Sequence, residues 1–186
     1  PKGMLLTARD RELLEAIYAF DGMMSAAQLQ RLFFASWRVT RERLGVLWAN
    51  GYIEKPNRRK RAALPCMVYW LGETGARIVA ERDKTPFGEF AWVKEPRWGQ
   101  IEHDVTVNDF RLDVLQAAEG VNFLEIGQWF SEGVFRSWKD NVSYEDDGKV
   151  VNRIITPDGY FEIWINRIQF RLMLELDMAT KDNPRF

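Results

Sequence analysis

Apolar residues recur at helical spacing through the first third of the chain. Residues 9–20 predict a helix that Thr7 and Asp10 would cap. Ser25, with Gln28 three residues later, predicts the start of a short second helix after a tight turn. The apolar stripe of this second helix would consist of Leu29, Leu32 and Phe33.

A third helix is predicted from Ser36, its N-cap, to the stop signal Asn50-Gly51. The face expected to pack carries Trp37, Thr40, Leu44, Leu47 and Trp48. The opposite face carries Arg38, Arg41, Glu42 and Gly45. We therefore expect the start of this helix to present positive charge to solvent.

After Gly51 the pattern changes to two short extended runs, residues 52–55 and 67–71. The loop between them holds four consecutive cations, Arg58, Arg59, Lys60 and Arg61, which predicts a hairpin with a basic tip. A helix over residues 74–81 would close the domain. Three helices followed by a two-stranded hairpin is the order of a winged helix-turn-helix, whose third helix enters the major groove of DNA.

The net charge of -1 conceals two oppositely charged halves. Residues 1–82 carry 14 Lys and Arg against 8 Asp and Glu, a net +6, and the remainder carries 12 against 19, a net -7. A basic patch beside a helical pattern is typical of a partner with a phosphate backbone. The residues expected to contact duplex DNA are Arg38 and Arg41, at base edges, with Arg43, and Arg58, Arg59, Lys60 and Arg61, at phosphates. The alternative is a solvated charge run on a dimerisation module, since many winged-helix domains bind proteins.

The second half predicts a small α/β domain. Residues 83–100 combine prolines, glycines and aromatics without a period, which indicates an ordered linker. Next come a helix over 101–118, strands at 122–126 and 129–131, and a polar loop over 139–149. The predicted domains are therefore 1–82, a linker at 83–100, and 101–186.

Residues 156–177 predict a β-hairpin with its turn at Asn166-Arg167. In this register, paired residue numbers sum to 333, as for Glu162 with Arg171. One face of the hairpin would then be wholly apolar: Phe161, Ile163, Ile165, Ile168, Phe170, Leu172, Leu174 and Leu176. A turn longer by two residues about the same centre would preserve the pairing.

The same register gathers three carboxylates, Asp158, Glu175 and Asp177. Their mutual repulsion would destabilise the hairpin unless something compensates the negative charge. A divalent metal such as Mg²⁺ or a cation from elsewhere would compensate it, or the side chains lie solvated at a strand end. His103 is either a partner of this cluster or a helix-start residue bonded to Glu102 or to linker backbone.

Composition excludes several classes of protein. The 186 residues are 46% hydrophobic and 28% charged, as in a globular protein. A single cysteine, Cys66, allows no intrachain disulfide, and the lone histidine excludes histidine-rich metal sites. No stretch without charge reaches the roughly 18 residues of a membrane span, and no signal peptide opens the chain, so we expect a cytoplasmic protein.

Both halves of the chain resemble the replication-relaxation family, which is linked to plasmid replication and plasmid DNA relaxation. The segments that carry the resemblance are LTARDRELLEAIYAFDGMMSAAQLQRLFF, RERLGVLWANGYIEK, YWLGETGARIVA, IEHDVTVNDFRL and TPDGYFEI with FRLMLELDMAT. Family members often continue past the ELD motif, so a terminal helix is expected to be missing here.

The second half also resembles a restriction-endonuclease-like core. That resemblance implies a metal-binding motif of Pro157-Asp158 and Glu175-Leu176-Asp177, with Glu102 or His103 as an added site residue. Asp177, however, stands where such a core has its catalytic lysine. The resemblance therefore favours a nuclease-like core that has lost its catalytic activity.

Together these observations predict an α+β protein that binds duplex DNA in plasmid-type replication, DNA relaxation or transcriptional control, without a required cofactor. Two alternatives stay open: a Mg²⁺-dependent nuclease using Asp158, Glu175 and Asp177, and an adaptor that recruits replication or mobilisation proteins. A homodimer would suit a palindromic site.

Overall fold

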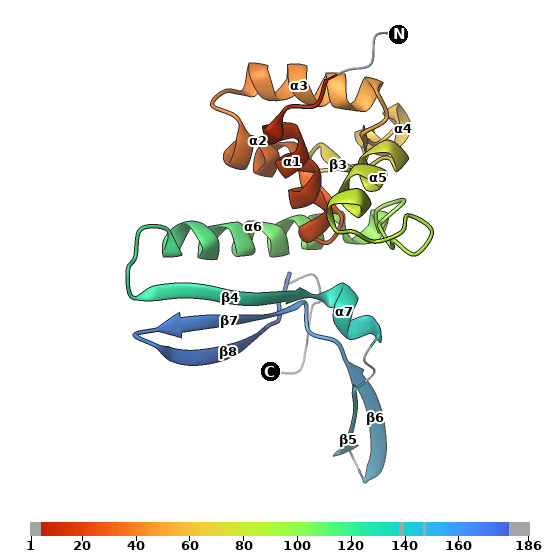
Figure 1. The fold of residues 1–186 in the computed structure, drawn as a ribbon. Helices are drawn as coiled ribbons and strands as arrows, with labels where there is room; N and C mark the ends of the chain where they lie inside the picture. The colour runs from red at the N-terminus through yellow and green to blue at the C-terminus, as the bar shows by residue number, and fades with distance from the viewer. Residues whose placement is uncertain (1–4, 138–139, 147, 179–186) are drawn as a thin grey trace. The chain divides into compact units, whose positions relative to one another are not determined.

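The computed structural model describes residues 5–137, 140–146 and 148–178, and it mixes helices with antiparallel strands, as α+β predicts (Figure 1). The chain forms two compact parts, which we call unit 1 (residues 1–109) and unit 2 (residues 110–186). The division falls inside helix α6 (Ile101–Ala118), whereas the sequence placed the start of the second domain at residue 101.

Unit 1 contains, in chain order, α1 (Ala8–Ala19), β1 (Met23–Ser25), α2 (Ala26–Phe33), α3 (Trp37–Ala49), β2 (Ile53–Glu54), α4 (Arg58–Ala62), β3 (Val68–Leu71), α5 (Glu73–Arg82) and the 3₁₀ turn η1 (Trp98–Gln100). Its sheet has the antiparallel order β1-β3-β2. Both predicted capping boxes are present, at Thr7 with Asp10 and at Ser25 with Gln28.

Two short elements of unit 1 differ from the prediction. Strand β1 has three residues, too few to show a period of their own, and it forms because β3 offers an edge to pair with. The predicted loop at the basic tip contains α4, which begins where the Asn57 side chain accepts a hydrogen bond from the backbone N–H of Lys60. The tip of the hairpin is therefore partly helical.

The predicted packing face of α3 is confirmed in its centre and wrong at its ends. Thr40, Leu44 and Leu47 are buried, but the side chains of Trp37 and Trp48 are 46% and 42% exposed. A surface helix buries one apolar stripe, and these two tryptophans lie at the border of that stripe. They are thus available at the surface beside the arginines of α3.

Residues 83–100 pack onto unit 1 through their aromatic side chains. The Phe90 ring stacks on Tyr18 with centroids 4.8 Å apart, and Phe90 is buried. The Trp98 ring meets Trp70 edge-on at 5.7 Å. The linker is therefore ordered within unit 1.

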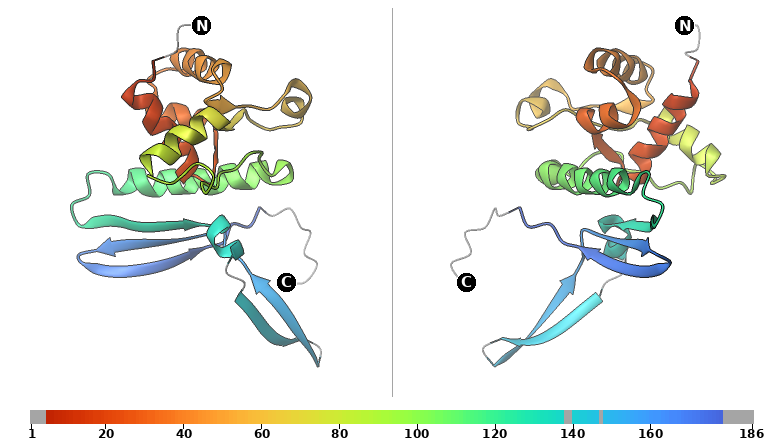
Figure 2. Two further views of the ribbon diagram at one scale, coloured as in Figure 1. Left: turned by 45° about the vertical axis from the view of Figure 1, so that its right-hand side comes forward. Right: turned by 90° about the vertical axis from the view of Figure 1, so that its left-hand side faces the viewer.

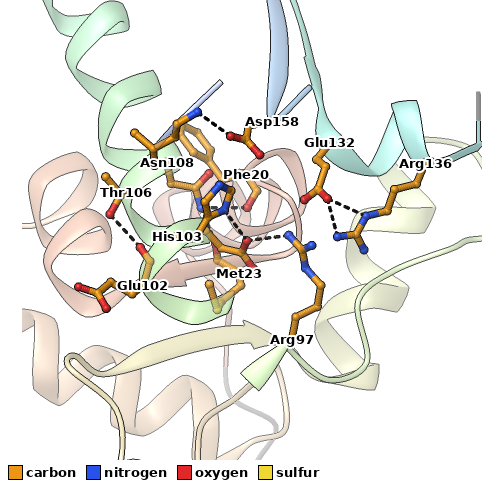
Figure 3. Close-up of polar contacts among 12 residues, drawn as sticks. Phe20, Met23, Arg97, Glu102, His103, Thr106, Asn108, Glu132, Arg136 and Asp158 are labelled. Carbon is orange, nitrogen blue, oxygen red and sulfur yellow. Dashed lines mark hydrogen bonds and ion pairs between the residues drawn. The ribbon is translucent and has the colours of Figure 1, made fainter. Parts of the chain in front are cut away.

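The first half of α6 also belongs to the core of unit 1. Ile101 is buried in one cluster with residues of β1 and β3. The buried Asn108 amide donates to the carbonyls of Phe20 and Met23, at 3.3 and 2.9 Å (Figure 3). The Gln28 amide donates to Val105 O at 2.8 Å. These bonds join α6 to β1, to α2 and to the end of α1, so a domain ending at residue 82 would lack them.

A buried ion pair fastens α3 to α1. Asp10 is fully buried, and its carboxylate accepts a hydrogen bond from Arg43 Nε at 2.7 Å and a second from the Arg43 Nη2 group. It also accepts from the Thr7 backbone N–H and hydroxyl. Burial raises the pKa of Asp10, but the hydrogen bonds from Arg43 and Thr7 outweigh it and lower the pKa from 3.8 to about 2.

Unit 2 contains β4 (Leu124–Ser131), α7 (Glu132–Ser137), β5 (Asp140–Asp146), β6 (Lys149–Ile155), β7 (Gly159–Ile165) and β8 (Ile168–Leu174), with the second half of α6. Strands β4, β7 and β8 form one sheet in that order, and β5 and β6 form a second sheet (Figure 2). The predicted register of the β7–β8 hairpin is confirmed at every pair from Gly159↔Leu174 to Ile165↔Ile168. Asn166 and Arg167 make the two-residue turn, with φ of 49° and 69°.

The predicted polar loop over 139–149 is wrong for residues 140–146, which form strand β5 and pair with β6. Residues 138, 139 and 147 lie outside the described part. Alternating residues such as Val142 and Tyr144 have high β-propensity, which explains why a charged segment is extended here.

Aromatic rings define the core of unit 2. Trp129 stacks on Phe161 with centroids 4.6 Å apart, and Phe110 of α6 meets Phe161 edge-on at 5.9 Å. Phe161 is 4% exposed, but on the same face of the sheet Ile168 of β8 is 62% exposed. The predicted apolar face therefore exists, and only the part near Phe161 is well covered.

We expect Gly75→Ala to destabilise unit 1, because a Cβ at this position would lie 2.0 Å from the backbone oxygen of Tyr52. Overpacking against backbone costs about 1–3 kcal/mol. Urea unfolding followed by circular dichroism measures the loss. Gly45→Ala is the control: no atom lies within 4 Å of its added Cβ, so it should leave stability unchanged or raise it by up to about 1 kcal/mol.

Acid should weaken unit 1 through Asp10. A carboxyl whose pKa falls from 3.8 to about 2 on folding stabilises the fold above pH 3.8, and this contribution is lost as the pH falls toward 2. The lost contribution amounts to about 2 kcal/mol. Measured between pH 6 and pH 2, the free energy of unfolding of Asp10→Asn should be lower at pH 6 and should fall less steeply. Equal slopes for the two proteins would contradict this role.

Candidate nucleic-acid interface

The solvent-facing side of α3 carries the two arginines that the sequence assigned to base edges. Arg38 and Arg41 are exposed, and Arg38 lies 3.5 Å from Glu42 on the next turn. Both arginines line a shallow surface hollow with Trp37 and Glu42. Gly45 follows on the same side, with open space where a side chain would be.

Arg43, which the sequence grouped with the DNA-contacting cations, points inward instead. It holds the buried Asp10 carboxylate, and this hydrogen-bonded pairing raises the pKa of its guanidinium above the usual value. Arg43 is two residues from Arg41, about 200° further round the helix. The fold therefore uses Arg43 to position α3.

The four cations of the basic tip differ in their surroundings. Arg58 and Arg59 are exposed at the start of α4. Lys60 forms an ion pair with Glu95, and its ammonium lies 4.0 Å from the centre of the Trp98 ring. Arg61 donates to the carbonyl oxygen of Leu64 at 3.0 Å.

Lys60 thus fastens α4 to the linker. The Glu95 carboxylate that it pairs with also accepts from Trp98 Nε1 at 2.7 Å, and these hydrogen bonds lower the pKa of Glu95. The position of α4 is therefore set by one of its own cations, while Arg58 and Arg59 stay at the surface.

Two observations relate α3 to the cations that follow it in the chain. Burial raises the pKa of Tyr69, and the positive charges of Arg41 on α3 and of Arg61 on α4 partly oppose that rise. The ammonium of Lys55, on the segment between β2 and α4, lies 3.4 Å from the centre of the Trp48 ring at the end of α3. The sequence placed Trp48 on the packing face of α3 and did not count Lys55 among the DNA contacts, because no spacing rule connects a helix end with the strand that follows the turn.

Three of these cations keep an unneutralised charge. Among the described residues, no carboxylate lies within 4.0 Å of Arg41, Arg58 or Arg59. Lone exposed cations are common on proteins, but three of them on the consecutive helices α3 and α4 add to the positive potential of this part of unit 1. These three cations, with Arg38, Lys55 and Arg61, are what we call the basic surface.

The three predicted metal-binding carboxylates lie in unit 2. Asp158 is nearly buried, and its Oδ2 accepts a hydrogen bond from the backbone N–H of Leu176 at 2.7 Å (Figure 3). Glu175 and Asp177 are exposed. Among the described residues, which include all three, no group of three or more His, Cys, Asp or Glu side chains could hold a metal ion. We therefore derive no metal-dependent step.

His103 belongs to unit 1, on the first turn of α6. Its Nδ1 lies 3.4 Å from Asp104 Oδ1, which also accepts from Arg97 at 2.6 Å. From the sequence we expect His103 to bond to Glu102 or to linker backbone, or to lie beside the predicted metal-binding carboxylates. Figure 3 shows the side chains of His103 and Arg97 both directed at the carboxylate that they share.

Across the described residues, no helix is long and apolar enough to cross a membrane. Neither the curated proteins nor the solved structures gave a match to the chain. The family model described as replication-relaxation matches residues 14–186. The match includes α3, α4 and all of unit 2, and the chain therefore belongs to the replication-relaxation family.

Proposed function

We propose that unit 1 binds duplex DNA through the basic surface, and that the protein acts in plasmid-type replication or DNA relaxation. The observation that carries the proposal is the set of exposed, unneutralised cations Arg41, Arg58 and Arg59 on α3 and α4. Like charges held close together at a surface repel, and a polyanion removes that repulsion. Membership of the replication-relaxation family makes DNA the natural polyanion.

The order of elements supports a winged helix-turn-helix mode of binding. From α1 to β3, unit 1 runs helix, strand, helix, helix, strand, short helix, strand, with α3 as the third helix. In that class of domain the third helix enters the major groove. Here α4 interrupts the hairpin that would form the wing, so the wing would contact DNA through a short helix. Arg58 and Arg59 would then contact phosphates.

The solvent side of α3 fits close approach to DNA. Gly45 weakens an exposed helix by about 1 kcal/mol relative to Ala, and no packing contact in unit 1 requires it. A residue without a side chain lets another molecule come near the helix backbone. With Gly45 at the groove, Arg41 about one turn earlier and Arg38 about two turns earlier would reach base edges, where arginine binds guanine.

Reversing the charge of α4 should weaken binding. Arg58→Glu with Arg59→Glu removes two phosphate contacts, so the slope of log affinity against log salt concentration should become shallower by roughly two. Fluorescence anisotropy with a labelled duplex at several salt concentrations measures both affinity and slope.

The control carries the same change in net charge at exposed cations outside the basic surface, Arg11→Glu with Lys84→Glu. It should bind with nearly the parent slope. If both double variants lose affinity equally, the effect comes from net charge, and α4 is not the phosphate contact.

A side chain added on the open side of α3 should prevent this helix from entering the major groove of DNA. Gly45→Gln meets no atom of unit 1 within 4 Å of its Cβ, so stability should be maintained while affinity for duplex DNA falls. Gly88→Gln, at an equally open glycine in the linker, is the matched control and should bind normally. If Gly45→Gln binds duplex DNA as tightly as the parent, α3 does not enter the major groove.

A further inference from the structure

Strand β8 is an edge of the unit 2 sheet, and among the described residues no further strand pairs with it. The opposite edge, β4, is interrupted by a bulge between Ile126 and Trp129, whereas β8 pairs with β7 over seven consecutive residues. Four of the seven residues of β8 are large, apolar and exposed: Ile168, Phe170, Leu172 and Met173. Natural proteins shield such edges because they accept further strands.

The register identifies which backbone groups face outward. A two-residue turn makes Ile165 and Ile168 a hydrogen-bonded pair, and bonded and non-bonded pairs then alternate. Gln169 and Arg171 therefore belong to non-bonded pairs, and their backbone N–H and C=O groups point away from β7. An added strand would find these groups in position to bond.

The β5–β6 hairpin also has strand edges to which no further strand pairs among the described residues. It forms a separate two-stranded sheet, and β5 and β6 make their substantial contacts only with each other among the described elements. Val142, Tyr144 and Val150 are exposed on it. Isolated two-stranded hairpins are marginally stable in water. An additional strand would stabilise this one.

The sequences of the two segments are opposite in charge. Residues 140–146 carry three acidic side chains and no basic one, while residues 167–174 carry two arginines and no acidic residue. Opposite charges on paired strands stabilise the pairing, whereas two copies of either segment would place like charges together. The favoured neighbour of β8 is therefore β5.

We infer that the protein forms a two-fold homodimer in which the β5–β6 hairpin of each copy adds to the β8 edge of the other. Both copies then use the same two surfaces, which closes the assembly at two chains. Each junction extends the three-stranded sheet by backbone hydrogen bonds and covers Phe170 and its apolar neighbours. This inference does not depend on DNA binding.

The test is the mass of the full chain in solution, by light scattering during gel filtration over a range of concentrations. The parent should have twice the mass of one chain. Gln169→Pro removes an outward N–H without touching a β7–β8 bond, which edge strands tolerate. It should weaken dimerisation about tenfold for each of the two junctions. Gln169→Thr keeps the N–H and should remain dimeric.

A charge exchange tests the identity of the added strand. Glu145→Lys and Arg171→Glu should each weaken the dimer, and the double variant should recover it. The 3.8 Å pair of Arg171 with Glu162 is exposed on the arginine side and contributes little to folding. Circular dichroism confirms that each variant is folded. A monomeric parent, a dimer indifferent to Gln169→Pro, or a double variant without recovery would each overturn the inference.

Discussion

The buried ion pair between Asp10 and Arg43 determines how α3 is presented. Asp10 has no exposed surface, and a buried carboxylate is costly unless a cation and hydrogen bonds compensate it. Arg43 supplies both, which fixes the rotation of α3 about its axis. Since Arg41 lies about 200° from Arg43 on the helix, the same contact that turns Arg43 inward turns Arg41 toward solvent.

A similar division of roles holds on α4. Lys60 is held by Glu95 and by the Trp98 ring, and Trp98 packs edge-on against Trp70 in the core. The neighbouring Arg58 and Arg59 have no acidic partner among the described residues. In both helices one cation is used for positioning, and neighbouring cations stay exposed. The linker thus contributes to the basic surface although it carries none of its cations.

Unit 2 shows why an apolar pattern alone does not define a core. Its sheet has a continuous apolar face, and neighbouring strands lie about 4.8 Å apart, so one helix about 10 Å wide covers roughly two strands. Phe161 on the central strand is buried, and Phe170 on the edge strand is 45% exposed. Among the described residues, the third strand therefore keeps an exposed apolar side at the edge of the sheet.

Local interactions were readable from the sequence. Both capping boxes, the bounds of α6 and the whole β7–β8 register depend on residues close in the chain, whose spacing fixes which groups meet. Contacts between distant segments were not readable: the inward turn of Arg43, the docking of Asn108 on Phe20 and Met23, and the use of Asp158 to bind the Leu176 N–H. An arginine or a carboxylate has the same sequence signature whether it faces water or a buried partner. Only the tertiary structure brings the partner within reach and so decides between the two.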